Sequence, residues 1–142
     1  MIQTLTGVQN TAAALSAEQT RLDIISENIA NANTTHGVDG KPYQRQVVVF
    51  ESALQQAMSS DGNVQMPAVH VARIEKDTTP PIKIYDPGNP EADSNGMISE
   101  PNIDINEEMA DLISASRTYE ANLAVVKNAH TMAMETLAIG KH

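Results

Sequence analysis

The sequence contains no cysteine and no tryptophan, and aromatic residues make up only 3% of it. Without cysteine, disulfides, thiolate metal sites and cysteine nucleophiles are excluded. With so few aromatic rings, burial has to come from many contacts of Leu, Ile, Val, Met and Ala. A chain of 142 residues accommodates one compact domain or two small ones. The composition therefore argues against a large multi-site enzyme.

Positive charge and long apolar runs are also scarce. Eighteen acids against nine bases give a formal net charge of −9, which opposes binding to nucleic acid or to an anionic membrane surface. The longest apolar runs have about four residues, as in Val47–Phe50, whereas a spanning helix needs roughly 20. The first cation is Arg21, so the start of the chain does not read as a cleaved signal peptide. We expect neither a nucleic-acid partner nor a membrane-spanning segment.

Apolar and small residues recur every three or four positions near both ends of the chain. This spacing predicts amphipathic helices over about residues 5–32 and 105–139. Each is long for so small a protein, and we expect the two to pack against each other as an antiparallel pair resembling a coiled coil. The first ladder is Leu5, Val8, Ala12, Leu15, Gln19, Leu22, Ser26 and Ile29, and the second is Met109, Leu112, Ser116, Tyr119, Leu123, Val126, His130, Ala133 and Leu137.

Capping chemistry marks both ends of the second helix. Asp104 followed three residues later by Glu107 predicts a capping box at its start. Gly140, followed by Lys141 and His142, is typical of a helix end.

The middle of the chain has a different character. Short β-branched runs separated by Gly, Pro and Asn turns predict strands near 43–50, 69–74, 82–84 and 97–98. The predicted fold class is α+β, with long N- and C-terminal helices and a small β-rich middle module. We divide the chain at 1–35 and 104–142 for the helical core domain and 36–103 for the middle module.

A motif at the end of the first helix resembles the signature of flagellar rod and hook proteins. It comprises Asn28–Thr34 (NIANANT), followed by Tyr43 and Arg45. Two further segments, 85–93 (YDPGNPEAD) and 107–122 (EEMADLISASRTYEAN), resemble a proximal-rod member of that family. The resemblance covers nearly the whole chain except residues 52–67.

The resemblance implies a structural subunit of the basal-body rod, the helical shaft that crosses the periplasm, transmits motor torque and houses the export channel. The implied partners are other copies of the chain, other rod proteins, and the region at the rod base where the MS ring and the export gate meet. The implied route is the flagellar type III exporter, without a cleaved signal peptide. Neither a cofactor nor a small-molecule substrate is implied.

We expect the apolar ladders and the motif asparagines to contact neighbouring subunits. For the asparagines a local capping role is the alternative, because Asn tolerates left-handed geometry and often ends helices. The predicted interface residues are Leu5, Val8, Leu15, Leu22, Ile29, Asn28, Asn31, Asn33, Met109, Leu112, Tyr119, Leu123, Val126 and Leu137.

The sequence offers only weak candidates for a catalytic or metal-binding site. The segment 91–98 copies part of a calcium loop, but Asn102 stands where the closing Glu is needed, so a turn is the better interpretation. The four histidines lack metal-binding spacing. Glu107 and Glu108 are explained by a helix start. We therefore predict no catalytic or metal site and no enzyme activity.

Two other functions are compatible with the residues alone. One is a soluble coiled-coil adaptor that never polymerises, which would form a defined small oligomer. The other is a small hydrolase, which would require a nucleophile and a base, yet none of the familiar hydrolase motifs occurs.

Overall fold

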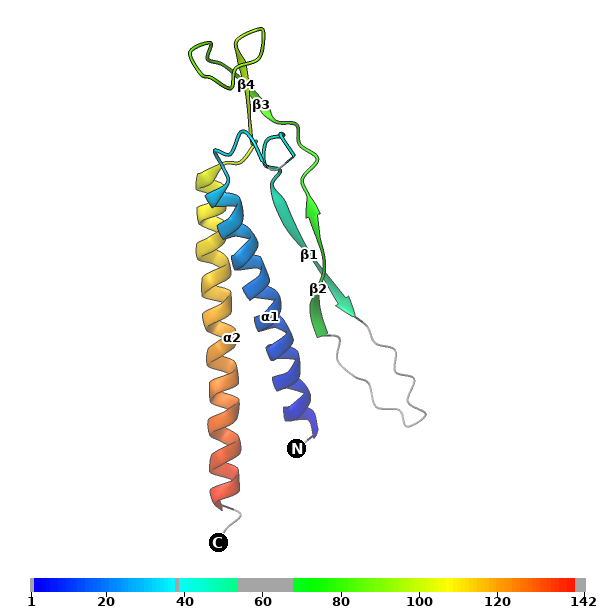
Figure 1. The fold of residues 1–142 in the computed structure, drawn as a ribbon. Coiled ribbons are helices and arrows are strands. Elements are labelled where there is room, and N and C mark those ends of the chain that lie inside the picture. The colour runs from blue at the N-terminus through cyan, green and yellow to red at the C-terminus, as the bar shows by residue number, and fades with distance from the viewer. Residues whose placement is uncertain (1, 38, 54–67, 140–142) are drawn as a thin grey trace.

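The computed structural model describes residues 2–37, 39–53 and 68–139 (Figure 1). One long helix lies near each end of the sequence and four strands lie between them, which confirms the predicted α+β class. The elements are α1 (Ile2–Ala30), β1 (Gln46–Ala53), β2 (Ala68–Lys76), β3 (Ile82–Tyr85), β4 (Met97–Glu100) and α2 (Ile105–Ile139).

The two helices lie side by side and run in opposite directions (Figure 1). At 1.5 Å per residue, the 29 residues of α1 span about 43 Å and the 35 residues of α2 about 52 Å. The C-terminal end of α2 consequently extends past the start of α1. The predicted antiparallel pair is confirmed.

The buried stripe of α2 is offset from the predicted ladder. Residues that are buried or only partly exposed recur with alternating spacings of four and three at Glu108, Leu112, Ala115, Tyr119, Asn122, Val126 and Ala129. The predicted ladder shares Leu112, Tyr119 and Val126 with this stripe, but its other members lie on the flank. The stripe includes a glutamate, Glu108, which a pattern of apolar and small residues leaves out, and it also contains Ala115, which is 0% exposed.

A second difference concerns α1, which packs against the middle of the chain as well as against α2. Strands β1 and β2 form an antiparallel hairpin that lies along α1 on the side opposite α2 (Figure 1). The sequence analysis paired the two helices with each other and did not predict that the middle segment also packs against α1. Strands of eight and nine residues at about 3.3 Å per residue are in fact long enough to cover much of α1. The domain boundaries stay predictions.

The other two strands form a short antiparallel ribbon that projects beyond the end of the helix pair (Figure 1). Its turn is closed by Asp93, whose Oδ1 accepts hydrogen bonds from the backbone N–H groups of Asn95 (2.7 Å) and Met97 (3.0 Å). Gly96 has φ of 73°, a left-handed conformation that favours glycine. The calcium-like segment is therefore a turn, as the sequence favoured.

The start of α2 is capped as predicted by Asp104, whose Oδ1 accepts from Asn106 N at 2.8 Å. The reciprocal bond expected of Glu107 is not among the described hydrogen bonds of Asp104, and Glu107 is exposed. The predicted helix end at Gly140–His142 lies outside the described residues. Across the described helices, no segment is long and apolar enough to cross a membrane.

Where side-chain burial is described, over residues 7–30 of α1 and along α2, the buried residues lie in the halves nearest the middle of the chain: Ala17, Ile24, Ile25 and Asn28 in α1, and Glu108 and Ala115 in α2. By contrast, every residue from His130 to Ile139 is exposed. Because isolated helices without packing are marginal in water, the stability of this pair is concentrated at one end.

Amide hydrogen exchange of the purified chain should follow this gradient. We expect the slowest exchange in 17–28 and 108–119, and exchange close to that of an unpacked helix in 130–139, because local opening is easiest where little is buried. Equal protection along the whole of α2 would contradict the gradient.

Candidate subunit interface and the buried network that supports it

Two polar side chains are buried where the helices meet the rest of the chain. Asn28, near the end of α1, and Glu108, in the first turn of α2, are each 1% exposed. A buried polar group is costly unless it is hydrogen-bonded, and a buried carboxylate more so unless it is also paired with a cation.

The Asn28 amide uses its full hydrogen-bonding capacity within the chain. Its Nδ2 donates to Gln46 O (2.9 Å) and to Glu108 Oε2 (3.1 Å). Its Oδ1 accepts from Gln46 N (2.9 Å) and from the Tyr43 hydroxyl (3.1 Å). Two donors and two acceptors are all that a side-chain amide offers. Asn28 therefore joins α1 to the first residue of β1 and to α2.

The Glu108 carboxylate is neutralised by Arg45, which immediately precedes β1. Arg45 Nε donates to Glu108 Oε1 at 2.6 Å. Burial by itself would lower the pKa of the Arg45 guanidinium, but the hydrogen bond and the charge of Glu108 raise it overall. Arg45 thus stays charged beside the buried carboxylate.

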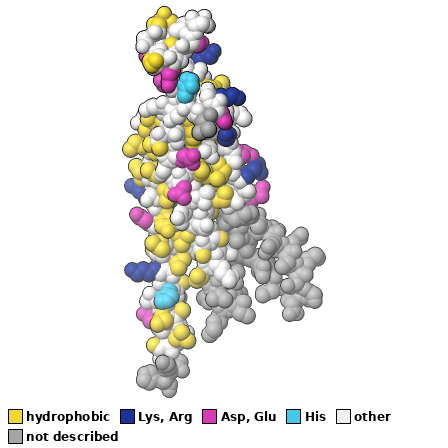
Figure 2. Space-filling model, viewed as in Figure 1, with side chains coloured by type: hydrophobic (Ala, Val, Ile, Leu, Met, Phe, Trp, Pro, Cys, Tyr) yellow, Lys and Arg dark blue, Asp and Glu magenta, His cyan; other side chains and the backbone are white. Residues whose placement is uncertain are grey.

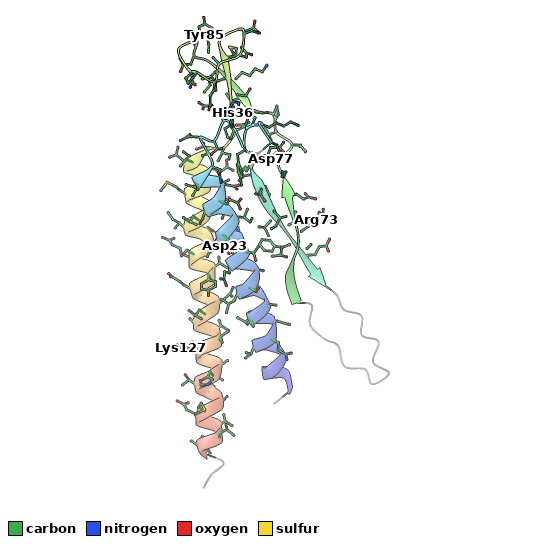
Figure 3. All side chains as sticks on the ribbon, viewed as in Figure 1. Asp23, His36, Arg73, Asp77, Tyr85 and Lys127 are labelled. Atoms are coloured by element: carbon green, nitrogen blue, oxygen red, sulfur yellow. The ribbon has the colours of Figure 1, made fainter. Side chains whose placement is uncertain are left out.

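Arg45 also closes the base of the β1–β2 hairpin. Its carbonyl oxygen accepts from the backbone N–H of Asp77 at 2.7 Å, and its Nη1 lies 3.9 Å from Asp77 Oδ2. Asp77 directly follows β2, at the hairpin end nearest the helix junction (Figure 3). The same arginine therefore links the hairpin base to the start of α2.

Tyr43 completes the network as both donor and acceptor. Its hydroxyl donates to Asn28 and accepts from Gln46 Nε2 at 3.1 Å. Burial raises the pKa of this phenol, so it remains protonated at neutral pH. We call Asn28, Tyr43, Arg45, Gln46 and Glu108 the junction network.

The network differs from the role predicted for Asn28, which we expected to contact a neighbouring subunit but which is buried inside the chain and bonded to Glu108. Glu108 lies in the first turn of α2, as predicted, but the sequence did not indicate that it is buried there. Tyr43 and Arg45 belong to the motif recognised in the sequence, but nothing local indicates that Arg45 reaches a residue 63 positions away.

The other two motif asparagines lie nearer the surface. Asn31 is partly exposed and bonds locally, with Nδ2 donating to Glu27 O at 2.9 Å. Asn33 is exposed, and since no described non-glycine residue has a positive φ, it does not form a left-handed cap. A contact of Asn33 with another subunit stays a prediction.

The predicted apolar interface residues divide into two groups. In the single chain, Val8, Leu15, Leu22, Ile29, Leu112, Tyr119 and Val126 are partly buried. Met109, Leu123 and Leu137 are 51, 50 and 67% exposed. The side chain of Leu5 lies outside the described part of the structure. Contacts of any of these residues with other chains stay predictions.

The junction network holds the helices and the hairpin together, and it leaves few polar atoms free to bind a ligand or to react. Each carboxylate oxygen of Glu108 and each polar atom of the Asn28 side chain is already engaged within the chain. A substrate or a metal would have to displace these bonds. The arrangement therefore resembles a structural joint.

Two family models match the helical ends of the chain. One, described as "Flagella basal body rod protein", matches residues 9–37, and the other, "Flagellar basal body rod FlgEFG protein C-terminal", matches residues 94–139. These ranges contain most of α1 and all of α2, together with Asn28 and Glu108.

Curated relatives match over almost the full length. Flagellar basal-body rod protein FlgC of Yersinia enterocolitica is 40% identical over 129 residues, covering 91% of this chain and 92% of the relative. FlgC of Salmonella typhimurium is 37% identical with the same coverage. FlgC of Bacillus subtilis is 38% identical over 141 residues, covering 92% and 93%.

The paired terminal helices and the two family matches define the chain as a flagellar basal-body rod protein, a structural class. Within that class, the extent and identity of the full-length matches are decisive. The chain belongs to the FlgC family and is a structural subunit of the rod.

We expect Arg45→Met to destabilise the chain because it leaves Glu108 buried without its cation. The loss in unfolding free energy should be about 1–3 kcal/mol, moderated because the Arg45 side chain is 25% exposed. Urea unfolding followed by circular dichroism measures it. Adding Glu108→Gln should recover part of the loss, since a neutral amide costs less to bury.

Arg73→Met provides the matched control. Arg73 also pairs with a glutamate, Glu75, but both side chains are at least half exposed, and exposed pairs contribute little. Its urea midpoint should stay close to that of the parent. Equal effects of the two substitutions would contradict a special role for the junction network.

Acid should destabilise the chain through three carboxylates. Hydrogen bonds from Thr79 lower the pKa of Asp77, a hydrogen bond from Thr35 lowers that of Glu91, and the N–H groups of Met97 and Asn95 lower that of Asp93. Below the usual values of 4.5 for Glu and 3.8 for Asp, the unfolded chain binds more protons than the folded one. The stabilisation is thus present above those values and lost as pH falls through the folded pKa.

Urea midpoints measured between pH 7 and pH 3 should therefore be flat at first and then fall below about pH 4.5. Asp77→Asn should reduce the drop, because the amide no longer titrates. A midpoint that rises on acidification would contradict the expected sign.

Proposed function

We propose that the chain polymerises with copies of itself and with other flagellar rod proteins into the helical shaft that crosses the periplasm and transmits motor torque. At the base of the rod it contacts the region where the MS ring and the export gate meet. It reaches that position through the flagellar type III exporter, without a cleaved signal peptide.

The observation that carries this proposal is the apolar surface of α2. Large hydrophobic side chains stay exposed on it from end to end: Ile105, Met109, Ile113, Leu123, Val125, Met132, Met134, Leu137 and Ile139. Figure 2 shows hydrophobic side chains at the surface along the length of the helix pair. Extended apolar surface of this kind marks an interaction site.

The shape of the chain fits a helical polymer better than a closed oligomer. The surface of α2 and the surface of the β1–β2 hairpin, on opposite sides of α1, are not alike. An open helical assembly needs contacts between such unlike faces. Interiors packed at high density resist deformation, as a shaft under torque must. Membership in the FlgC family supports this function over a non-polymerising adaptor.

The absence of cysteine and the small amount of buried surface also suit export of an unfolded chain. No disulfide has to be broken before passage or formed afterwards. Few described residues are fully buried, so much of the apolar surface is left to be covered by neighbouring subunits.

Replacing Leu123 by Asp should abolish motility. Leu123 is 50% exposed in the single chain, so the isolated variant should fold, but assembly would bury an unpaired charge among apolar groups at high cost. Electron microscopy of basal bodies should show inner rings and no hook. Leu15→Asp should act in the same direction, although Leu15 is already partly buried in the chain.

Leu123→Met is the matched control, because it keeps the side-chain volume and apolar character. Cells carrying it should swim and build hooks. Complete hooks in cells carrying Leu123→Asp would show that this part of α2 is not an assembly surface.

A further inference from the structure

The exposed methionines among the described residues all lie on α2. Met109, Met132 and Met134 are 51, 63 and 58% exposed. Met97 of β4 is the remaining described methionine, and it is only partly exposed. The chain has three more, which lie outside the described residues: Met1, Met58 and Met66. Helix α2 is therefore where the described part of the chain presents thioether sulfur to solvent.

A solvent-exposed thioether reacts directly with hydrogen peroxide. One oxygen atom is transferred to sulfur: the S–O bond forms, the O–O bond breaks, sulfur loses two electrons, and the peroxide is reduced to water. A cysteine thiolate would compete for the oxidant, but the chain has no cysteine. Methionine is consequently its only oxidisable sulfur, and exposure decides which methionines react first.

The exposed methionines lie among the apolar side chains that the proposed function assigns to assembly. Met109 and Met134 are 14 and 11 positions from Leu123, close to four and three turns of 3.6 residues, so the three share one side of α2. Met132 is seven positions from Ile139, close to two turns, and these two share another side. Leu123 and Ile139 are 50 and 77% exposed.

Oxidation at these positions changes polarity without touching the interior of the chain. None of the three methionines is buried, and the whole segment from His130 to Ile139 is exposed. In the free chain the new oxygen of a sulfoxide therefore stays in water. Covered by a neighbouring subunit, the same oxygen would be buried among apolar groups without a hydrogen-bond donor, which is costly.

We propose that Met109, Met132 and Met134 are oxidation sites at which conversion to the sulfoxide blocks assembly and leaves the fold of the single chain intact. The inference rests on the proposed polymerisation, because the sulfoxides become costly only where a neighbouring subunit covers them. The free chain is the susceptible form, and a chain already in the rod is protected.

Peroxide footprinting tests both halves of this statement. The purified chain, the same chain unfolded in urea, and intact basal bodies are treated with hydrogen peroxide, and sulfoxide at each methionine is followed by mass spectrometry of peptides. In the free folded chain, Met109, Met132 and Met134 should oxidise about as fast as in urea, whereas Met97 should be slower than in urea. Helix content by circular dichroism should not change.

In basal bodies the three α2 methionines should be protected relative to the free chain. Equal rates in basal bodies and in the free chain would overturn the proposal, because nothing would then cover these side chains. Slow oxidation of all three in the free folded chain, or loss of helix content on oxidation, would overturn it as well.

Substitutions in cells test the effect of polarity on assembly. Met109→Gln, Met132→Gln and Met134→Gln are combined in one chain as a permanent polar replacement, and the matched control carries Leu at the same three positions, which keeps volume and apolar character. We expect the Gln variant to build no hook and the Leu variant to swim. Complete hooks with the Gln variant, or no hooks with the Leu variant, would overturn the proposal.

These failures are distinguishable from a failure of the proposed function. If basal bodies of the unmodified strain contain the chain, a contrary result in either experiment concerns oxidation alone and leaves the rod function intact. If basal bodies of the unmodified strain lack the chain, the proposed function itself is wrong.

Discussion

The burial of the Glu108 carboxylate at the start of α2 is the constraint on which the rest of the arrangement depends. A carboxylate that is 1% exposed is tolerable only if a cation and hydrogen-bond donors reach it. Arg45 provides the cation, and Asn28 provides a donor from α1. Because these groups come from three separate segments, the helix pair and the hairpin base have to assemble together.

This single joint explains how a small chain supports such long helices. The described buried residues of both helices lie in the halves nearest the junction, while the far end of α2 is exposed. The chain by itself is thus held firmly at one end only. Large hydrophobic side chains of α2 stay exposed along this elongated chain, which agrees with a structural subunit of the rod.

Part of the candidate site was predictable from the sequence. The assignments that differ from the structure have a common cause. The apolar ladder of α2 indicated a helix that packs, but it placed Met109 in the stripe where Glu108 belongs. A pattern of apolar residues cannot identify a buried glutamate, because its burial depends on Arg45, 63 positions away. For the same reason Asn28 was assigned to contacts between chains, although its four hydrogen bonds are internal.

The elements and the family were predictable from the amino-acid sequence alone: two terminal helices, short strands between them, the cap at Asp104, the turn at Asp93 and the rod-protein motif. These follow from local spacing, from side chains that bond within a few residues, and from residues in a recognisable order. Three features became visible only in the folded chain: which side of each helix is buried, that the β1–β2 hairpin lies along α1, and that the motif residues Asn28, Tyr43 and Arg45 form an internal joint. Those outcomes depend on charges and surfaces that meet only after the chain has folded, so no local pattern encodes them.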